Sequence, residues 1–64
     1  MNYTITKGGL KTIAEARQDH TIVSIYFDGE LMDKIPVNST DIVQSAEAIM
    51  SGATAMFSTK NQLL

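Results

Sequence analysis

The N-terminal part of the chain carries two different hydrophobic patterns in succession. Residues 2–6 alternate apolar side chains with threonine, which is the period-two pattern of a short β-strand. After Gly8-Gly9, apolar side chains and an arginine stem recur at helical spacing. These residues are Leu10, Ile13, Ala14 and Arg17. The sequence therefore predicts a strand over 2–6 and a first helix over about 9–18, with Thr6 as its N-cap.

The strongest strand signal lies in the middle of the chain. Residues 21–27 are almost all β-branched or aromatic, and residues 30–37 follow them after Asp28-Gly29, a dipeptide typical of tight hairpin turns. A β-hairpin is therefore predicted over 21–37. Because proline cannot donate to a ladder, we expect the second strand to end at Pro36 or to run along a sheet edge.

The register of this hairpin follows from keeping its apolar residues on one face. A two-residue type I′ turn would place Glu30 and Lys34 beside the apolar row, whereas a bulge at Gly29 changes the parity of the second strand. We therefore expect the bulged turn, with Asp33 near the sheet edge. The inner face then holds Val23, Ile25, Phe27, Leu31, Ile35 and Val37, and the outer face holds Ser24, Tyr26, Glu30, Met32 and Lys34.

A second, longer amphipathic helix is predicted after the hairpin. The segment Asn38-Ser39-Thr40-Asp41 supplies a capping side chain and an acid in the first turn, where the helix dipole favours negative charge. Apolar residues then recur at spacings of four and three, at Ile42, Ala46, Ile49, Ala53 and Met56. Gly52 either ends this helix or permits close backbone approach by a partner. Residues 58–64 are expected to fray, although Leu63 and Leu64 could dock on the core.

These elements predict a single α+β domain over residues 1–64 with the order β-α-β-β-α. A three-stranded sheet built around the central β-hairpin, with both helices packed on one face, buries both apolar stripes. The first strand then lies parallel to the second or pairs antiparallel with the third. A chain this short buries only about 60% of the surface that its unfolded form exposes, so its stability depends on a good core or on oligomerisation.

Composition narrows the chemistry. The chain has no cysteine and one histidine, so neither a cofactor nor a metal ion is expected. The net charge of −2, with five scattered Lys and Arg, argues against direct binding of nucleic acid, which needs a basic face. No apolar run reaches the ~20 residues of a membrane span and no signal peptide is visible, so we expect a cytoplasmic protein with no membrane partner.

We do not expect an enzyme, because the residue sets of ordinary catalysis are missing. His20 has no nucleophile motif beside it and is interpreted as a surface residue. Gly8-Gly9 lacks the spacing of a phosphate loop, although amides at the start of the predicted helix could hold an anion near Lys7 and Lys11.

The hairpin offers the best candidate for a binding surface. The predicted register places Tyr26 and Met32 side by side on the outside, next to an acidic tip whose spacing does not fit a calcium loop. The candidate partner-binding residues are Tyr26, Asp28, Glu30, Met32 and Asp33. We therefore expect a non-catalytic protein-interaction module that docks on the basic surface of a larger, nucleic-acid-handling host protein.

In size and charge the chain resembles small phage-encoded inhibitors of host proteins, including those that block defence nucleases. This resemblance implies an acidic inhibitor or adaptor. One alternative is a structural homo-oligomer, such as a homodimer built through the second helix or an open sheet edge. Another is a nucleotide or anion sensor at the Gly8-Gly9 helix start. Capture of one basic protein, a stable dimer, or thermal stabilisation by nucleotides distinguishes the three.

Overall fold

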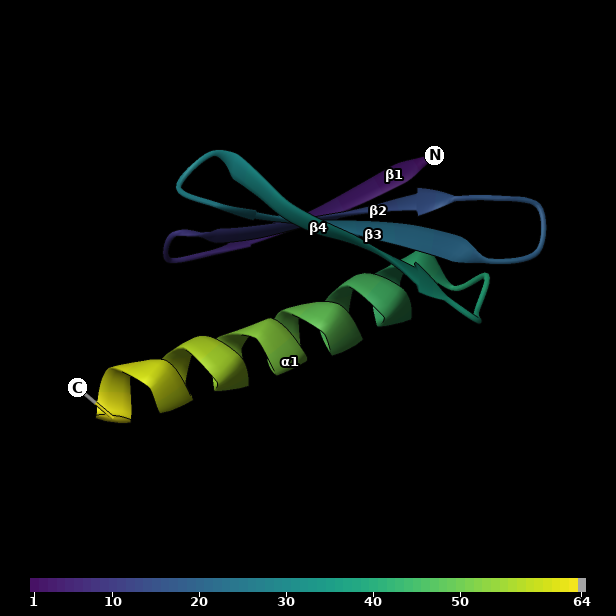
Figure 1. Cartoon of the computed structure of the whole chain (residues 1–64). Coiled ribbons are helices and arrows are strands. Elements are labelled where there is room, and N and C mark those ends of the chain that lie inside the picture. The colour runs from purple at the N-terminus through teal and green to yellow at the C-terminus, as the bar shows by residue number, and fades with distance from the viewer. Residues whose placement is uncertain (64) are drawn as a thin grey trace.

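The computed structural model consists of four β-strands followed by one α-helix (Figure 1). The elements are β1 (Asn2–Lys7), β2 (Leu10–Ala16), β3 (Thr21–Phe27), β4 (Glu30–Val37) and α1 (Ile42–Leu63). The sheet is antiparallel throughout in the order β1-β2-β3-β4, and α1 covers one of its faces. The structure describes residues 1–56 in full and the helical backbone as far as Leu63. The fraying predicted for 58–64, and the docking of Leu63 and Leu64, lie outside the described side chains.

The predicted first helix is wrong, and so is the three-stranded sheet with two helices. Residues Leu10–Ala16 form a strand, β2, and the fold is α+β with a four-stranded sheet and one helix. Along β2 the buried residues are Leu10, Thr12 and Ala14, which is a period of two. The helical spacing in this segment is coincidental. The alternation that marks a strand is hard to see in the sequence, because one of its buried positions is a threonine rather than an apolar residue. Thr6 therefore caps no helix, and β1 pairs antiparallel with β2.

Gly8 and Gly9 form a two-residue turn between β1 and β2. Gly8 has a φ of 60° and Gly9 does not have a positive φ, which is the pattern of a type II′ hairpin turn. A Cβ on Gly9 would lie 2.8 Å from Asp28 Oδ1 and 3.1 Å from the Phe27 ring. The Gly9 carbonyl also accepts a hydrogen bond from the Asp28 amide at 2.9 Å. Glycine at position 9 thus lets the two hairpin turns lie against each other at one end of the sheet.

The predicted β3–β4 hairpin is confirmed, but the predicted turn is wrong: the bulge is not at Gly29, and the turn is of the type I′ that the apolar pattern argued against. Asp28 and Gly29 have φ values of 51° and 83°, and two successive positive values are what a type I′ turn requires. The register shifts between Ile25 and Tyr26, and Met32 is the extra residue on β4. The hairpin therefore combines the tight turn with a parity change three residues further along β4.

The displaced bulge divides the predicted inner face. Val23 lies opposite Ile35, as expected, and β4 with its proline is an edge strand, also as expected. Beyond the bulge, Leu31 pairs with Tyr26 and Glu30 pairs with Phe27, so Leu31 does not share the face of Phe27. The apolar pattern alone indicates that a parity change is needed, but it does not locate it.

The core lies between α1 and the helix-facing side of the sheet. It has two buried clusters, Leu10 with Met50 and Ala53, and Ala14 with Val23 and Ala46. Alanine on both elements of the second cluster removes the side-chain volume that would hold the helix away from the sheet. Half-buried Tyr3 and Ile5 extend the core under β1.

Helix α1 begins directly after the predicted capping segment, but Asp41 is its cap rather than an acid within the first turn, which has none. Asp41 Oδ1 accepts a hydrogen bond from the Gln44 amide at 3.0 Å, which makes Asp41 the N-cap, and Ser39 Oγ accepts one from the Asp41 amide at 3.2 Å. The helix continues through Gly52, and a Cβ at that position would meet no described atom within 4 Å. Gly52 therefore neither ends the helix nor serves packing among the described residues. Within residues 1–63, no helix has the length and apolar character needed to cross a bilayer.

Two buried threonines provide a matched test of this core. Thr21 Oγ1 donates to the Ser39 carbonyl at 2.7 Å, whereas Thr12 Oγ1 is buried with no partner among the described residues. Thr12→Val is expected to raise the free energy of unfolding by about 1 kcal/mol, because valine has nearly the same shape and leaves no polar atom unsatisfied. Thr21→Val is expected to lower it by about 1 kcal/mol, because the Ser39 carbonyl loses its donor. Urea denaturation followed by circular dichroism measures both changes, and a destabilised Thr12→Val variant would contradict the assigned burial.

Candidate protein-binding site

The five residues predicted to bind a partner lie on two sides of the hairpin. Tyr26 lies on the sheet face away from α1, since it alternates with helix-facing residues along β3. Met32 and Asp33 both line a groove on the helix side. Asp28 and Glu30 are exposed at the turn. The structure therefore groups Met32 with Asp33 near the acidic tip, and it separates Tyr26 from Met32.

The bulge explains the position of Met32. As the extra residue of β4, Met32 has no register partner on β3, and a strand bends at such a residue. Its side chain is 54% exposed, so it contributes surface rather than core. Methionine is flexible and polarizable, which suits a side chain that must adapt to a partner.

The groove runs between β4 and α1 and has a volume of about 520 Å³. Its lining residues are Ile25, Met32, Asp33 and Ile35 from the sheet, and Ala48, Ile49, Gly52, Ala53 and Met56 from the helix. It is open because α1 packs mainly on β2 and then on β1 and β3, which leaves much of β4 uncovered. In Figure 1 the β3–β4 turn curls away from the helix. The groove is thus a consequence of placing one helix on a four-stranded sheet.

The helix side of the groove combines an exposed methionine with a glycine. Met56 is 66% exposed and lies one turn beyond Gly52 on the same wall. Because nothing described fills the space beside Gly52, the helix backbone can be approached closely there. A glycine inside a helix costs about 1 kcal/mol relative to alanine, so this wall is not optimised for the stability of the isolated chain.

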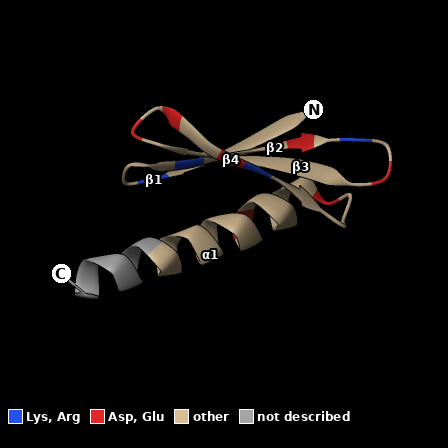
Figure 2. Cartoon of the chain, in the orientation of Figure 1, with Lys and Arg blue, Asp and Glu red and all other residues tan. Residues whose placement is uncertain are grey.

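Negative charge lies in the lining of the groove and on the β3–β4 turn that precedes its strand wall. Figure 2 shows acidic residues at the β3–β4 turn, which carries Asp28 and Glu30, and Asp33 is the charged residue among the described residues that line the groove. Asp33 Oδ1 accepts a hydrogen bond from the Lys34 amide at 2.8 Å. Lys34 itself lies opposite Ser24, on the sheet face away from α1, so its ammonium group does not occupy the groove. Among the described residues, the charge that lines the groove is therefore negative.

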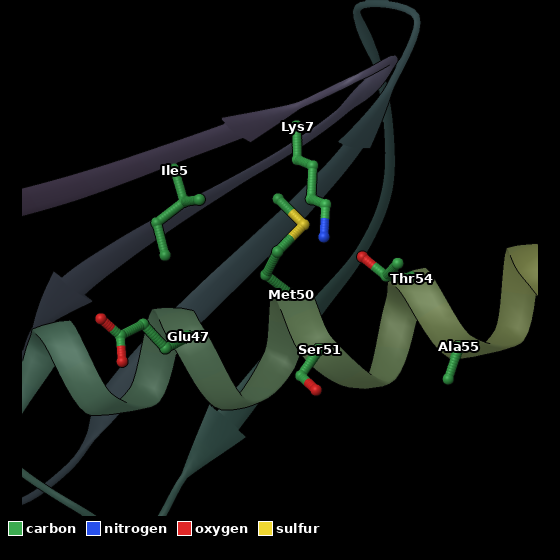
Figure 3. A pocket seen from close by; sticks show the side chains of 7 residues that line it. All are labelled: Ile5, Lys7, Glu47, Met50, Ser51, Thr54 and Ala55. Carbon is green, nitrogen blue, oxygen red and sulfur yellow. The ribbon is translucent and has the colours of Figure 1, made fainter.

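A second hollow lies on the other side of α1, between the helix and β1 (Figure 3). Its volume is about 400 Å³, and its lining residues are Ile5, Lys7, Glu47, Met50, Ser51, Thr54 and Ala55. Figure 3 shows Ile5 and Lys7 pointing from β1 toward the helix. This lining mixes both signs of charge with hydroxyl groups, so it offers less continuous apolar surface than the groove. No three His, Asp or Glu side chains of the described chain come together as metal ligands.

The sheet face away from α1 carries no other element of the described chain. Lys11 Nζ lies 5.3 Å from the centre of the Tyr26 ring, a cation–π contact that covers the aromatic side chain. Ile13 and Ile22 are half-buried on the same face. Because Lys11 already occupies the Tyr26 ring, this face is a weaker binding candidate than the groove.

The two remaining motifs of the sequence, His20 and Gly8-Gly9, do not form a binding or catalytic site with other described residues. His20 Nδ1 donates to Asp19 Oδ1 at 2.6 Å at the surface, and this hydrogen bond together with the attraction to the imidazole lowers the pKa of Asp19. Gly8-Gly9 connects two strands, so the predicted helix N-terminus that could have held an anion there does not exist. Neither position brings together groups that would act on a substrate.

Comparison with protein-family models, with curated proteins and with solved structures found no match for this chain. Its function is therefore inferred from its own surface chemistry.

Proposed function

We propose that this chain is a non-catalytic protein-binding module and that the groove between β4 and α1 is its binding site. The observation that carries the proposal is a continuous apolar groove, open to solvent, with Met32 and Met56 exposed on its two walls. Scattered apolar residues are common on protein surfaces, but a contiguous apolar groove with a polar rim is typical of an interaction site.

The partner that fits this groove is a protein segment with an apolar anchor flanked by basic residues. The anchor would lie between Ile35 on β4 and Ile49 on α1, where burial of its apolar surface supplies the binding energy. Basic flanks follow from Asp33 in the lining and from the acidic turn beside it, because complementary charges steer association and select the partner. Asp33 would be partly desolvated in the complex, which favours a cationic group placed against it.

A module of this kind acts by occupying a surface of its partner. Binding alone is enough to block or to bridge a larger protein, so the chain needs no reactive group of its own. Proteins that handle nucleic acids carry basic surfaces for that purpose and are the class of partner that an acidic groove suits. An inhibitor or adaptor of such a protein is the role that we propose.

Selection from a random peptide library, with the immobilised chain as bait, tests the proposal. We expect the enriched peptides to share a large apolar residue flanked by Lys or Arg. Their affinity should fall as salt is added, because exposed charges are screened at distances beyond a Debye length of about 8 Å at physiological ionic strength. Enrichment of acidic peptides, or no enrichment at all, would contradict the proposal.

A further inference from the structure

The two edge strands of the sheet, β1 and β4, differ in how much of their outward backbone is free. In an antiparallel ladder, alternate residues direct their amide and carbonyl toward the neighbouring strand and away from it. Two hydrogen bonds beyond the strand ends identify which residues do which. The Ala16 amide donates to the Met1 carbonyl at 3.3 Å, and the Arg17 amide donates to the His20 carbonyl at 2.9 Å.

Together with the register, these two bonds show toward which neighbour each strand residue directs its amide and carbonyl. Met1 bonds to Ala16, so the odd-numbered residues of β1 bond to β2, and the even-numbered ones direct their backbone outward. In the same way, even-numbered residues of β3 bond to β2 and odd-numbered ones bond to β4. Past the bulge, the odd-numbered residues of β4 therefore bond to β3, and Lys34 and Pro36 face outward.

The β4 edge is closed to a further strand. Pro36 has no amide, and the Lys34 amide already donates to the Asp33 carboxylate at 2.8 Å. The bulge at Met32 bends the strand beside them. Proline, charged side chains and bulges on an edge are the devices by which proteins prevent strands from adding there.

The β1 edge has no proline and no bulge, and its one charged residue, Lys7, is the last of the strand and points toward α1 rather than along the edge. Its outward-facing residues are Asn2, Thr4 and Thr6, which are exposed and uncharged and which keep both amide and carbonyl. Their outward amides and carbonyls have no hydrogen-bond partner within the part of the chain that the structure describes. Threonine also favours strand conformation, so this edge is prepared to extend the sheet.

We infer that β1 is an interface and that its partner is β1 of a second copy of this chain. A two-fold axis at Thr4 sets Thr4 against Thr4 of the other copy, Asn2 against Thr6, and Tyr3 against Ile5. Every outward-facing residue then meets an outward-facing residue. Thr–Thr pairs and aromatic pairs with β-branched residues are among the cross-strand pairs that stabilise sheets. Strand β1 is therefore complementary to itself in the antiparallel sense.

This pairing closes on itself. An isologous contact uses the same strand of both copies, so the joined sheet has twice the four strands of one chain and ends at two closed β4 edges. We therefore expect dimers rather than fibres. The groove between β4 and α1 lies on the far side of α1 from β1, so both copies keep it open. The dimer and the proposed function can thus hold or fail separately.

Analytical ultracentrifugation from micromolar to millimolar concentration tests the interface with two variants at one position. Thr4→Pro removes an outward amide that the single chain does not use, whereas Thr4→Val keeps that amide and the side-chain shape. We expect the full chain to dimerise and Thr4→Pro to raise the dimer Kd about tenfold or more, since each copy loses a hydrogen bond. Thr4→Val is expected to raise it much less, because that variant keeps the backbone hydrogen bonds and loses only the contact between the two hydroxyl groups. Circular dichroism checks that both variants fold.

Amide hydrogen exchange on the unmodified chain gives an independent readout that needs no variant. The amides of Asn2, Thr4 and Thr6 are expected to exchange more slowly as concentration rises, while the amide of Leu31 is expected not to change. A chain that stays monomeric at millimolar concentration would overturn the inference. So would a dimer in which exchange of the Thr4 amide is independent of concentration.

Discussion

Met56→Glu is expected to weaken binding of the basic, apolar-anchored peptides about thirtyfold or more, whereas Val43→Glu is expected to leave it nearly unchanged. Both side chains are exposed on α1, at 66% and 40%, but only Met56 lines the groove. A carboxylate at position 56 would have to be desolvated against the apolar anchor of the partner, which costs more than the lost contact alone. The expected factor corresponds to the ~2 kcal/mol that defines an interface hot spot.

The paired variant separates the groove from a general effect of charge. Each substitution adds one negative charge, so each strengthens long-range attraction to a basic partner to a similar extent. Calorimetric titration of both variants with the same peptide measures the difference, and circular dichroism confirms the helix. If the two variants bind equally well, the groove is not the binding site.

Met50→Ala is expected to lower the free energy of unfolding by about 2–5 kcal/mol. Met50 is 5% exposed and packs with Leu10 and Ala53 between helix and sheet, so truncation leaves a cavity that these short side chains do not fill. At ~0.05–0.15 kcal/mol per residue, a domain of this length has a total stability of about 3–10 kcal/mol, so the variant would be largely unfolded or close to it.

Met56→Ala is the control for this core substitution. It removes the same atoms from the same helix at an exposed position, and we expect a change within about 0.5 kcal/mol. Thermal and urea denaturation of both variants provide the comparison. Similar losses in the two variants would show that α1 does not pack on the sheet through Met50.

The hairpin and the C-terminal helix could be predicted because local signals and tertiary packing agree there. Asp28-Gly29 forms the hairpin turn as predicted, although as type I′ rather than the expected bulged turn, and the helix starts directly after the predicted capping segment, with Asp41 as its cap. The apolar stripe of the helix faces the sheet as far as Ala53, with Ala46 and Ala53 in the core, whereas Met56 at its end is exposed. In these segments the local preference of the residues, the hydrophobic pattern and the tertiary packing all favour the same secondary structure.

Strand β2 could not be predicted from periodicity, because its residues satisfy two patterns at once. Leu10, Ile13 and Ala14 fit a helix, while Leu10, Thr12 and Ala14 are the residues that the sheet buries. Thr12 is the decisive position, since a polar residue in the core hides the alternation. Gly8-Gly9 between two segments of strand length was the available signal, as a glycine pair is a common two-residue hairpin turn.

The candidate site could be predicted only on its strand side. Met32 and Asp33 follow from the hairpin, but the other wall comes from α1, through Ile49, Gly52 and Met56. The part of the helix that the sheet leaves uncovered depends on the number of strands. The sequence predicted three strands instead of four, because it assigned β2 to a helix. The displaced bulge added a second error, because it turned Met32 toward the groove and away from Tyr26.

The most direct test of the central claim is to locate a selected peptide on the chain by NMR of its methyl groups. Shifts are expected at Met32, Ile35, Ile49 and Met56, which line the groove. Ile13 and Ile22, on the sheet face away from α1, are expected to stay unmoved. Shifts confined to Ile13 and Ile22, with the groove methyls unchanged, would contradict the assignment of the groove as the protein-binding site.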